Sequence, residues 1–153
     1  KIAGGEVEEV TRLLGRSYGM LGEVVPGDCR GRKIGFPTAN LKPDEPDKLL
    51  PGNGVYVVRA KIDTSWIGGV ANIGTRPTFD GEGRGVEVHL LDFSGDLYGR
   101  QVELEFLARL RNERKFSSVS NLISQIQEDV KSARSRLRKT ENRGTESLVS
   151  KIA

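Results

Sequence analysis

The chain has 153 residues, of which 36% are hydrophobic and 29% are charged. This length suits one domain with a buried core, and this balance is typical of a globular protein. No run approaches the roughly 18 apolar residues that span a membrane, and no apolar secretory segment opens the sequence. One cysteine and one histidine exclude an intramolecular disulfide and a Cys/His zinc cluster, so we expect a reducing, cytoplasmic setting.

The net charge of +3 is unevenly distributed along the chain. Residues 131–153 hold seven Lys and Arg against two Asp and Glu, whereas residues 1–130 hold 17 against 19. A small β-barrel that binds nucleic acid is one interpretation of the basic excess. A body with this slightly acidic balance lacks the electrostatic footprint for DNA or RNA, so we expect no nucleic-acid partner and no membrane partner.

Apolar spacing predicts a short helix over 5–14, with acidic residues in its first turn and an end near Gly15. Short strands then follow one another with turn residues between them and no intervening helix. This pattern favours an antiparallel meander or barrel over a parallel sheet. We expect strands at 18–25, 55–62, 66–73, 86–91 and 101–110, and one more strand that begins at 34–36. Breaks are expected at 42–53, 63–64, 74–85 and 94–96.

The clearest helix follows the last strand. One apolar stripe runs from Val119 to Leu137 for about five turns, and Ser117 or Ser118 can cap its start. We expect this stripe to face the barrel. Beyond about Arg138 the apolar spacing ends, which predicts a basic, disordered tail over 139–153.

The segment Gly27–Asn40, GDCRGRKIGFPTAN, has the composition of an anion-binding turn. Glycine lets the backbone approach a ligand closely, and clustered basic side chains favour an anion such as phosphate. Pro37 fixes its own φ and restricts Phe36, so Thr38 and Asn40 are presented on a stiff piece of chain. A Gly/Pro-rich hairpin loop with solvated charges explains this stretch alone equally well.

Glu87 is the second candidate. Side chains alternate across a strand, so Glu87, His89 and Leu91 share one face. A carboxylate in a mostly apolar strand is costly to bury unless it is paired or functional, and the alternative is that this face is solvent. A lone histidine such as His89 is more often a structural residue than a catalyst. P-loop, Rossmann and Gly-x-Ser-x-Gly motifs are absent from the sequence.

Four segments occur in order and without large gaps: GRKIGFPTAN (31–40), GVANIGTRPTF (69–79), VEVHLLDFSGDLYG (86–99) and FLARLRNERKF (106–116). Together they resemble the riboflavin kinase family, and more narrowly the kinase half of bacterial bifunctional riboflavin kinase/FAD synthetases. The likeness covers about 14–133. Residues 4–18 resemble the helix that joins the two halves, whereas the His-x-Gly-His motif of the adenylyltransferase half is absent.

The resemblance implies a mainly β fold: a six-stranded, antiparallel, Greek-key-like barrel with a short N-terminal helix and a C-terminal helix across it. It divides the chain into a linker helix (1–15), a riboflavin kinase domain (16–138) and a tail (139–153). It also implies that ATP phosphorylates riboflavin to give FMN and ADP, with Mg²⁺ as cofactor. An N-terminal FMN adenylyltransferase domain would be covalently linked in the full-length chain.

The resemblance also implies residue roles. Thr38 would hold or orient the metal, Asn40 would position the phosphates and the base, and Glu87 would be the catalytic base. The nucleotide-binding residues would be Gly27, Arg30, Gly31, Arg32, Lys33, Gly35, Pro37, Thr38 and Asn40. The substrate-binding residues would be Asn40, Arg114 and Phe116. Arg114 and Phe116 either contact the substrates or only close their loop onto the barrel. A flavin-binding split barrel without catalysis is the alternative function.

Overall fold

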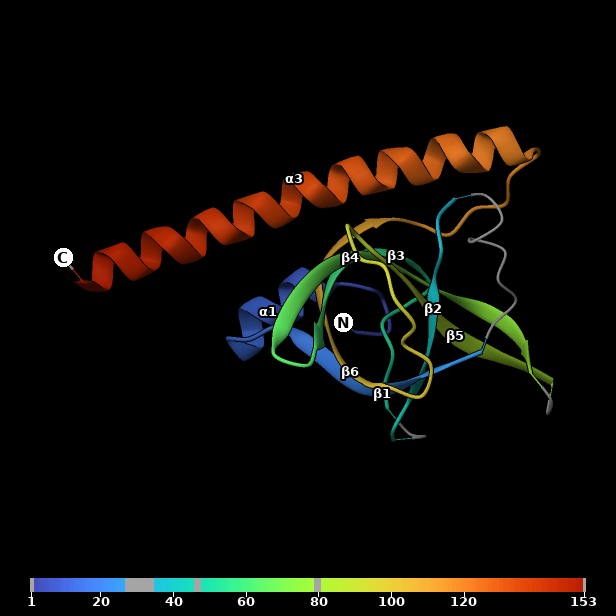
Figure 1. Cartoon of the computed structure of the whole chain (residues 1–153), viewed down its shortest axis with the longest axis horizontal. Helices are drawn as coiled ribbons and strands as arrows, with labels where there is room; N and C mark the ends of the chain where they lie inside the picture. The colour runs from blue at the N-terminus through green and yellow to red at the C-terminus, as the bar shows by residue number, and fades with distance from the viewer. Residues whose placement is uncertain (1, 27–34, 46–47, 79–80, 153) are drawn as a thin grey trace.

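A computed structural model describes residues 2–26, 35–45, 48–78 and 81–152. Its strands are β1 (Tyr18–Val25), β2 (Ala39–Pro43), β3 (Gly54–Ile62), β4 (Ser65–Thr78), β5 (Gly81–Leu90) and β6 (Gln101–Arg111), and its helices are α1 (Val7–Leu14) and α3 (Val119–Ile152). The strands close into a barrel in the order β1-β2-β5-β4-β3-β6, and every neighbouring pair is antiparallel (Figure 1). The predicted fold is confirmed.

Two predicted strand boundaries were wrong. The second strand begins at Ala39 rather than near 34–36, because Pro37 has no N–H to donate to a ladder. The segment 74–85, predicted as a break, instead contains the paired arms of β4 and β5, which match from Gly69↔Leu90 to Thr78↔Gly81. This segment is rich in glycine, but the hydrogen bonds of the ladder join backbone groups and require no side chain, as in the pair Gly74↔Gly85.

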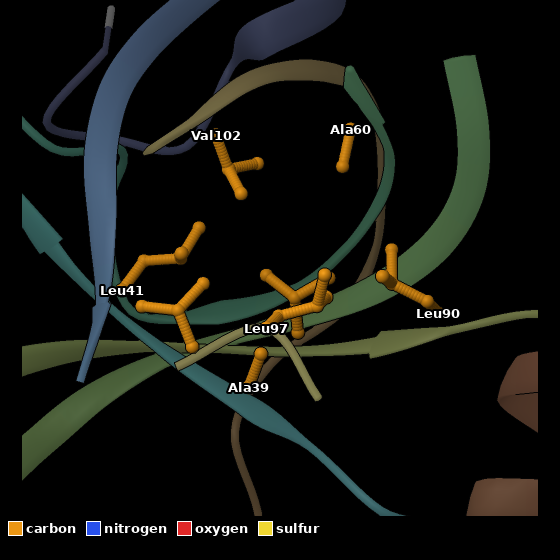
Figure 2. A pocket seen from close by; sticks show the side chains of 8 residues that line it. Ala39, Leu41, Ala60, Leu90, Leu97 and Val102 are labelled. Atoms are coloured by element: carbon orange, nitrogen blue, oxygen red, sulfur yellow. The ribbon is translucent and has the colours of Figure 1, made fainter. Parts of the chain in front are cut away.

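The inward-facing side chains fill the barrel. Phe106 and Tyr56 are fully buried and meet edge to face, with ring centroids 5.7 Å apart. One cavity among them measures about 10 Å³, roughly the room for one water molecule. The side chains in Figure 2 that line this cavity are all apolar: Val24, Ala39, Leu41, Ala60, Val88, Leu90, Leu97 and Val102. Any larger ligand therefore binds elsewhere than in this cavity.

The helix α1 packs against β6 and β1 and buries Val7 and Val10. It ends as predicted at Gly15, whose left-handed φ of 75° suits glycine, and whose N–H donates to the Thr11 carbonyl. A backbone hydrogen bond from Gly52 to Ile2 joins the N-terminal segment to the loop before β3.

The helix α3 crosses the outside of β3, β4 and β6. Its side chains Val130, Ala133 and Leu137 pack in one apolar cluster with Val57 and Ala108 of the barrel. The predicted inward stripe is therefore confirmed for this part of the helix.

Polar contacts support both ends of the α3 contact surface. Ser118 accepts a hydrogen bond from the Asn121 N–H at 3.1 Å, which confirms the predicted cap. Further along, Arg134 donates two hydrogen bonds to Asp92, at 2.7 and 2.9 Å. This guanidinium lowers the pKa of the Asp92 carboxyl.

The predicted end of the last helix near Arg138 was wrong, because α3 continues to Ile152 and its C-terminal end runs past the barrel (Figure 1). The segment 139–152 contains no proline and several residues that favour helix, so the helix continues where the apolar spacing has stopped. Among the described residues, no helix combines the length and the apolar character needed to cross a membrane.

Candidate active site on the outer face of the barrel

Five residues form one cross-strand row on the outer face of the barrel. Asn40 of β2 pairs with Glu87 of β5, and Glu87 pairs with Asn72 of β4. Asn72 also pairs with Val55 of β3, which in turn pairs with Arg111 of β6. Directly opposite residues in an antiparallel sheet share a face, with Cβ atoms about 4.5–5.5 Å apart. We name this set the outer row.

The alternation of β5 explains why Glu87 lies on this face. Its neighbours Val86 and Val88 are each 2% exposed and belong to the core inside the barrel. Successive side chains point to opposite faces, so Glu87 stands on the outside, where it is partly buried. The predicted separation of Glu87 from Val86 and Val88 is confirmed, and of the two environments that the sequence left open, the structure shows the outer face, with Glu87 between the carboxamide residues Asn40 and Asn72.

His89 supports the turn that precedes β2. Its Nδ1 lies 2.8 Å from the Pro37 carbonyl oxygen, and because a carbonyl only accepts, Nδ1 carries the proton of this hydrogen bond. The Phe36 ring meets the imidazole edge to face, with centroids 5.6 Å apart. His89 thus fixes the backbone next to Thr38, which agrees with a structural role for this lone histidine.

Thr38 and Asn40 flank one inward-facing residue. Ala39 lies between them and lines the small cavity inside the barrel. Asn40 pairs with Glu87 across the ladder, and Thr38 stands two residues before Asn40 in the chain, directly ahead of β2. The Asn40 carboxamide and the Glu87 carboxylate therefore come from two strands that are far apart in the sequence, and Thr38 directly precedes the first of these strands.

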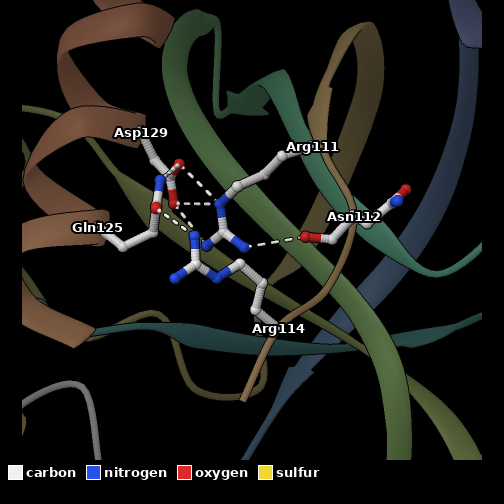
Figure 3. Close-up of polar contacts among 5 residues, drawn as sticks. All are labelled: Arg111, Asn112, Arg114, Gln125 and Asp129. Carbon is white, nitrogen blue, oxygen red and sulfur yellow. Dashed lines mark hydrogen bonds and ion pairs between the residues drawn. The ribbon is translucent and has the colours of Figure 1, made fainter. Parts of the chain in front are cut away.

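The other end of the outer row is fixed to α3 by charge-assisted hydrogen bonds (Figure 3). Arg111 donates to Asp129 through Nε at 2.9 Å and through a terminal nitrogen at 2.8 Å. Asp129 is only 5% exposed, and it also accepts a hydrogen bond from Gln125 at 3.0 Å. Arg111 donates in addition to the Asn112 carbonyl at 3.0 Å, so one guanidinium holds both α3 and the start of the loop 112–116.

The same loop carries the predicted substrate-binding residues. The Arg114 guanidinium carbon lies 5.0 Å from the Phe116 ring centroid, and Arg114 donates to Gln125 of α3 at 3.3 Å. On the barrel side, the Glu113 carboxylate packs against Gly74, where an added Cβ would collide with it. Gly74 is two residues from Asn72 on the same face of β4. The loop 112–116 therefore bridges α3 and the outer row.

The structure pairs Asn40 with Glu87, with Thr38 two residues before Asn40 in the chain, and it places the loop of Arg114 and Phe116 beside the same face of β4. Gly35 and Pro37 lie in the turn before Thr38, and Gly35 has a left-handed φ of 90°. The remaining predicted nucleotide-binding residues lie outside the described residues: Gly27, Arg30, Gly31, Arg32 and Lys33.

Sequence reasoning missed Asn72 and Glu113. A signal for Asn72 was present, because this polar residue interrupts the apolar strand Val70–Ile73. Its partner Glu87 was not predictable from spacing, because the order of strands around the barrel decides which residues meet. Glu113 had no local signal, since only the folded loop brings it to Gly74.

The described residues offer oxygen ligands rather than a cation cage. No cluster of three or more His, Cys, Asp or Glu capable of holding a metal occurs among them. The Thr38 hydroxyl and Asn40 carboxamide are hard oxygen donors, and Mg²⁺ in nucleotide sites takes one or two protein ligands together with phosphate and water oxygens. These residues fit a magnesium ion that is bound jointly with a nucleotide.

Two named proteins are similar in sequence to most of this chain. A bifunctional riboflavin kinase/FMN adenylyltransferase from Haemophilus influenzae is 42% identical over 134 residues, which cover 87% of this chain and 43% of the relative. The protein of the same name from Escherichia coli K12 is 45% identical over 123 residues, which cover 80% and 39%. The chain thus spans less than half the length of the relatives it matches.

Solved structures match as well. A Streptococcus pneumoniae protein described as a macrolide-efflux protein superposes with a TM-score of 0.82 and 41% identity, over 87% of this chain and 43% of that one. Riboflavin kinase from Trypanosoma brucei superposes with a TM-score of 0.55 and 27% identity, over 79% and 80%. The model of the family described as "Flavokinase: Riboflavin kinase" matches residues 14–137. The chain therefore belongs to the riboflavin kinase family.

Proposed function

We propose that this chain transfers the γ-phosphoryl group of ATP to the terminal hydroxyl of the ribityl chain of riboflavin, giving FMN and ADP. Membership of the riboflavin kinase family supports the reaction class. The observation that carries the proposal at residue level is the adjacent pair of Asn40 and Glu87, with Thr38 one residue before β2.

Glu87 would act as the general base. Its carboxylate accepts the proton of the attacking hydroxyl while a bond forms between that oxygen and the γ-phosphorus. The bond from the γ-phosphorus to the bridging oxygen breaks, and its electron pair leaves with ADP. Phosphoryl transfer depends mainly on positioning and on neutralising charge, and a well-placed base contributes about 10²- to 10⁴-fold to the rate.

Thr38 would hold or orient the magnesium ion that accompanies ATP through its hydroxyl oxygen, and Asn40 would position the phosphates and the base. When bound, this ion neutralises negative charge on the phosphate oxygens. The chain's own contribution is to fix these two residues: Ala39 anchors the strand between them, and the hydrogen bond from His89 to the Pro37 carbonyl fixes the turn. The segment 27–35 would bind the rest of the nucleotide.

The loop 112–116 and the first turns of α3 would hold the flavin. Arg114 and Phe116 lie together on this loop, and an arginine and an aromatic ring both stack on planar rings. The network of Arg111, Asp129 and Gln125 fixes the loop to α3 and so orders these two side chains before the substrate binds.

We also propose that the full-length protein carries an FMN adenylyltransferase domain. The relatives are named for both activities, and this chain matches only about two fifths of their length. FMN made by the kinase would then be the substrate of the linked domain.

The test is FMN formation from riboflavin and ATP, with and without Mg²⁺, followed by chromatography. Glu87→Gln should keep the fold and lose about 10²- to 10⁴-fold in turnover. The matched control is Glu103→Gln, which changes a partly buried glutamate on β6 that pairs with Leu21 and Lys61, away from the outer row. Equal turnover in wild type and Glu87→Gln would remove the base assignment.

The same measurement separates the kinase from a flavin-binding barrel without catalysis. The kinase gives FMN that depends on both ATP and metal. A chain that binds flavin tightly but yields no FMN under these conditions would favour the binding module. Circular dichroism of each variant shows whether the barrel has been retained.

A further inference from the structure

Asn72 contains a buried acceptor without a donor. Its side-chain oxygen has almost no contact with solvent and makes no hydrogen bond in the described structure. Most buried polar atoms in proteins have a partner, and an unsatisfied one costs stability. This oxygen is therefore a candidate contact for a group that the free chain does not supply.

Among the described residues, only one other buried side-chain nitrogen or oxygen lacks a hydrogen-bond partner, the Nε of Arg109. Arg109 has a structural explanation, because another nitrogen of the same guanidinium donates to the Asn53 carbonyl at 2.8 Å. Its guanidinium carbon also lies 6.0 Å from the centroid of the buried Tyr56 ring, and Gly5 of the N-terminal segment packs against both side chains. Asn72 differs because its cross-strand neighbour is Glu87.

We propose that the Asn72 side-chain oxygen accepts a hydrogen bond from a hydroxyl of the polyol chain, next to the hydroxyl that Glu87 deprotonates. This inference rests on the proposed function, because it assigns a contact to the same substrate. Asn72 would then be a binding residue that selects a polyhydroxylated chain over a simple alkyl alcohol.

The chemistry of the Asn72 side-chain oxygen limits the groups that can bind it. A carboxamide oxygen only accepts, so its partner is a hydrogen-bond donor or a cation, whereas a fully ionised phosphate oxygen is neither. Opposite Cβ atoms lie about 4.5–5.5 Å apart, so a residue beside the base reaches groups adjacent to the reacting hydroxyl. In a polyol those groups are hydroxyls, which are donors.

The test compares two flavins without divalent metal and without nucleotide. One is riboflavin, and the other is a flavin with a 5-hydroxypentyl chain at N10, which keeps the terminal hydroxyl and lacks the others. Binding to wild type and to Asn72→Leu is measured by quenching of flavin fluorescence, with thermal unfolding of both proteins alongside. Leucine approximates the shape of asparagine and removes the buried acceptor.

We expect Asn72→Leu to lower the preference for riboflavin over the analogue by about 3- to 10-fold, the usual net effect of one hydrogen bond. Its melting temperature should equal or exceed that of wild type, because an unsatisfied buried acceptor has been removed. Affinity for the analogue should be unchanged, since that flavin offers Asn72 no neighbouring hydroxyl.

Three results would overturn the inference: an unchanged preference in Asn72→Leu, a preference that appears only when metal is added, or a marked fall in melting temperature that reveals a structural role. Failure of the proposed function would look different. In that case wild type would make no FMN from riboflavin and MgATP, while the contribution of Asn72 to the preference between the two flavins remained.

Discussion

The two faces of β5 differ in what their side chains do. Val86 and Val88 point inward into the buried core, where Val88 lines a cavity of about 10 Å³. Glu87, between them, points outward into a row that contains two carboxamides and, further on, a guanidinium. One alternating strand therefore contributes core residues on its inner face and candidate site residues on its outer face.

This comparison sets an expectation for mutations. Changes inside the barrel should reduce the free energy of unfolding, and any loss of activity should follow from unfolding. Changes on the outer row should reduce activity or ligand affinity while the fold persists. Residues between these regions, such as those beneath α3, should affect both properties.

The largest effect on stability is expected at the centre of the barrel. Phe106→Ala removes a fully buried ring that packs edge to face on Tyr56, and it leaves a cavity that the closed sheet cannot collapse. We expect a loss of about 3–5 kcal/mol in the free energy of unfolding. Urea unfolding followed by circular dichroism measures it.

Glu103→Gln, on the outside of β6, is the control and should change the free energy of unfolding by less than about 0.5 kcal/mol. A loss below about 1 kcal/mol for Phe106→Ala would show that the interior is loosely packed. The contrast between the two faces would then have no basis in packing.

An intermediate effect is expected under α3. Asp129→Asn removes the charge of a carboxylate that accepts three hydrogen bonds from Arg111 and one from Gln125. Hydrogen bonds to charged groups contribute more than neutral ones, so we expect a loss of about 1–3 kcal/mol in the free energy of unfolding. Flavin affinity should fall as well, because Arg111 also holds the loop 112–116 through the Asn112 carbonyl.

The control for this variant is Asp92→Asn, which breaks the exposed pair with Arg134. Arg134 lowers the pKa of Asp92, so the stabilisation it gives is present above the unfolded-state pKa and is lost as the pH falls through the folded-state value. Asp92→Asn should therefore flatten only the acid side of the stability profile and leave flavin affinity unchanged. Equal loss of flavin affinity in both variants would contradict a specific role for Asp129.

Local pattern predicted the barrel strands and the separation of Glu87 from Val86 and Val88, because a period of two is a property of one strand. The roles of Thr38 and Asn40 came from the family resemblance and stay predictions. What local pattern missed depends on contacts between distant segments. The pairing of β2 and β4 with β5 brings Asn40 and Asn72 to Glu87, and the hydrogen bonds of Arg111 with Asp129 join a strand to a helix.

The smallest effect on the free energy of unfolding is expected at Gly74. This variant compares the outer face of β4 with the loop 112–116 that packs on it. An added Cβ at Gly74 would meet the Glu113 carboxylate, the far end of a flexible side chain, whereas at Gly69 it would lie 2.7 Å from the backbone oxygen of His89. Gly69→Ala, the control, must displace a paired strand and should cost about 1–3 kcal/mol in the free energy of unfolding. Gly74→Ala needs only a new rotamer of Glu113, so we expect less than about 0.5 kcal/mol. Thermal and urea unfolding of the two variants measure the difference. Equal losses in the two variants would mean that the loop 112–116 is held as rigidly as the sheet. A flavin that binds between the loop and β4 would then have to displace the whole loop rather than one side chain.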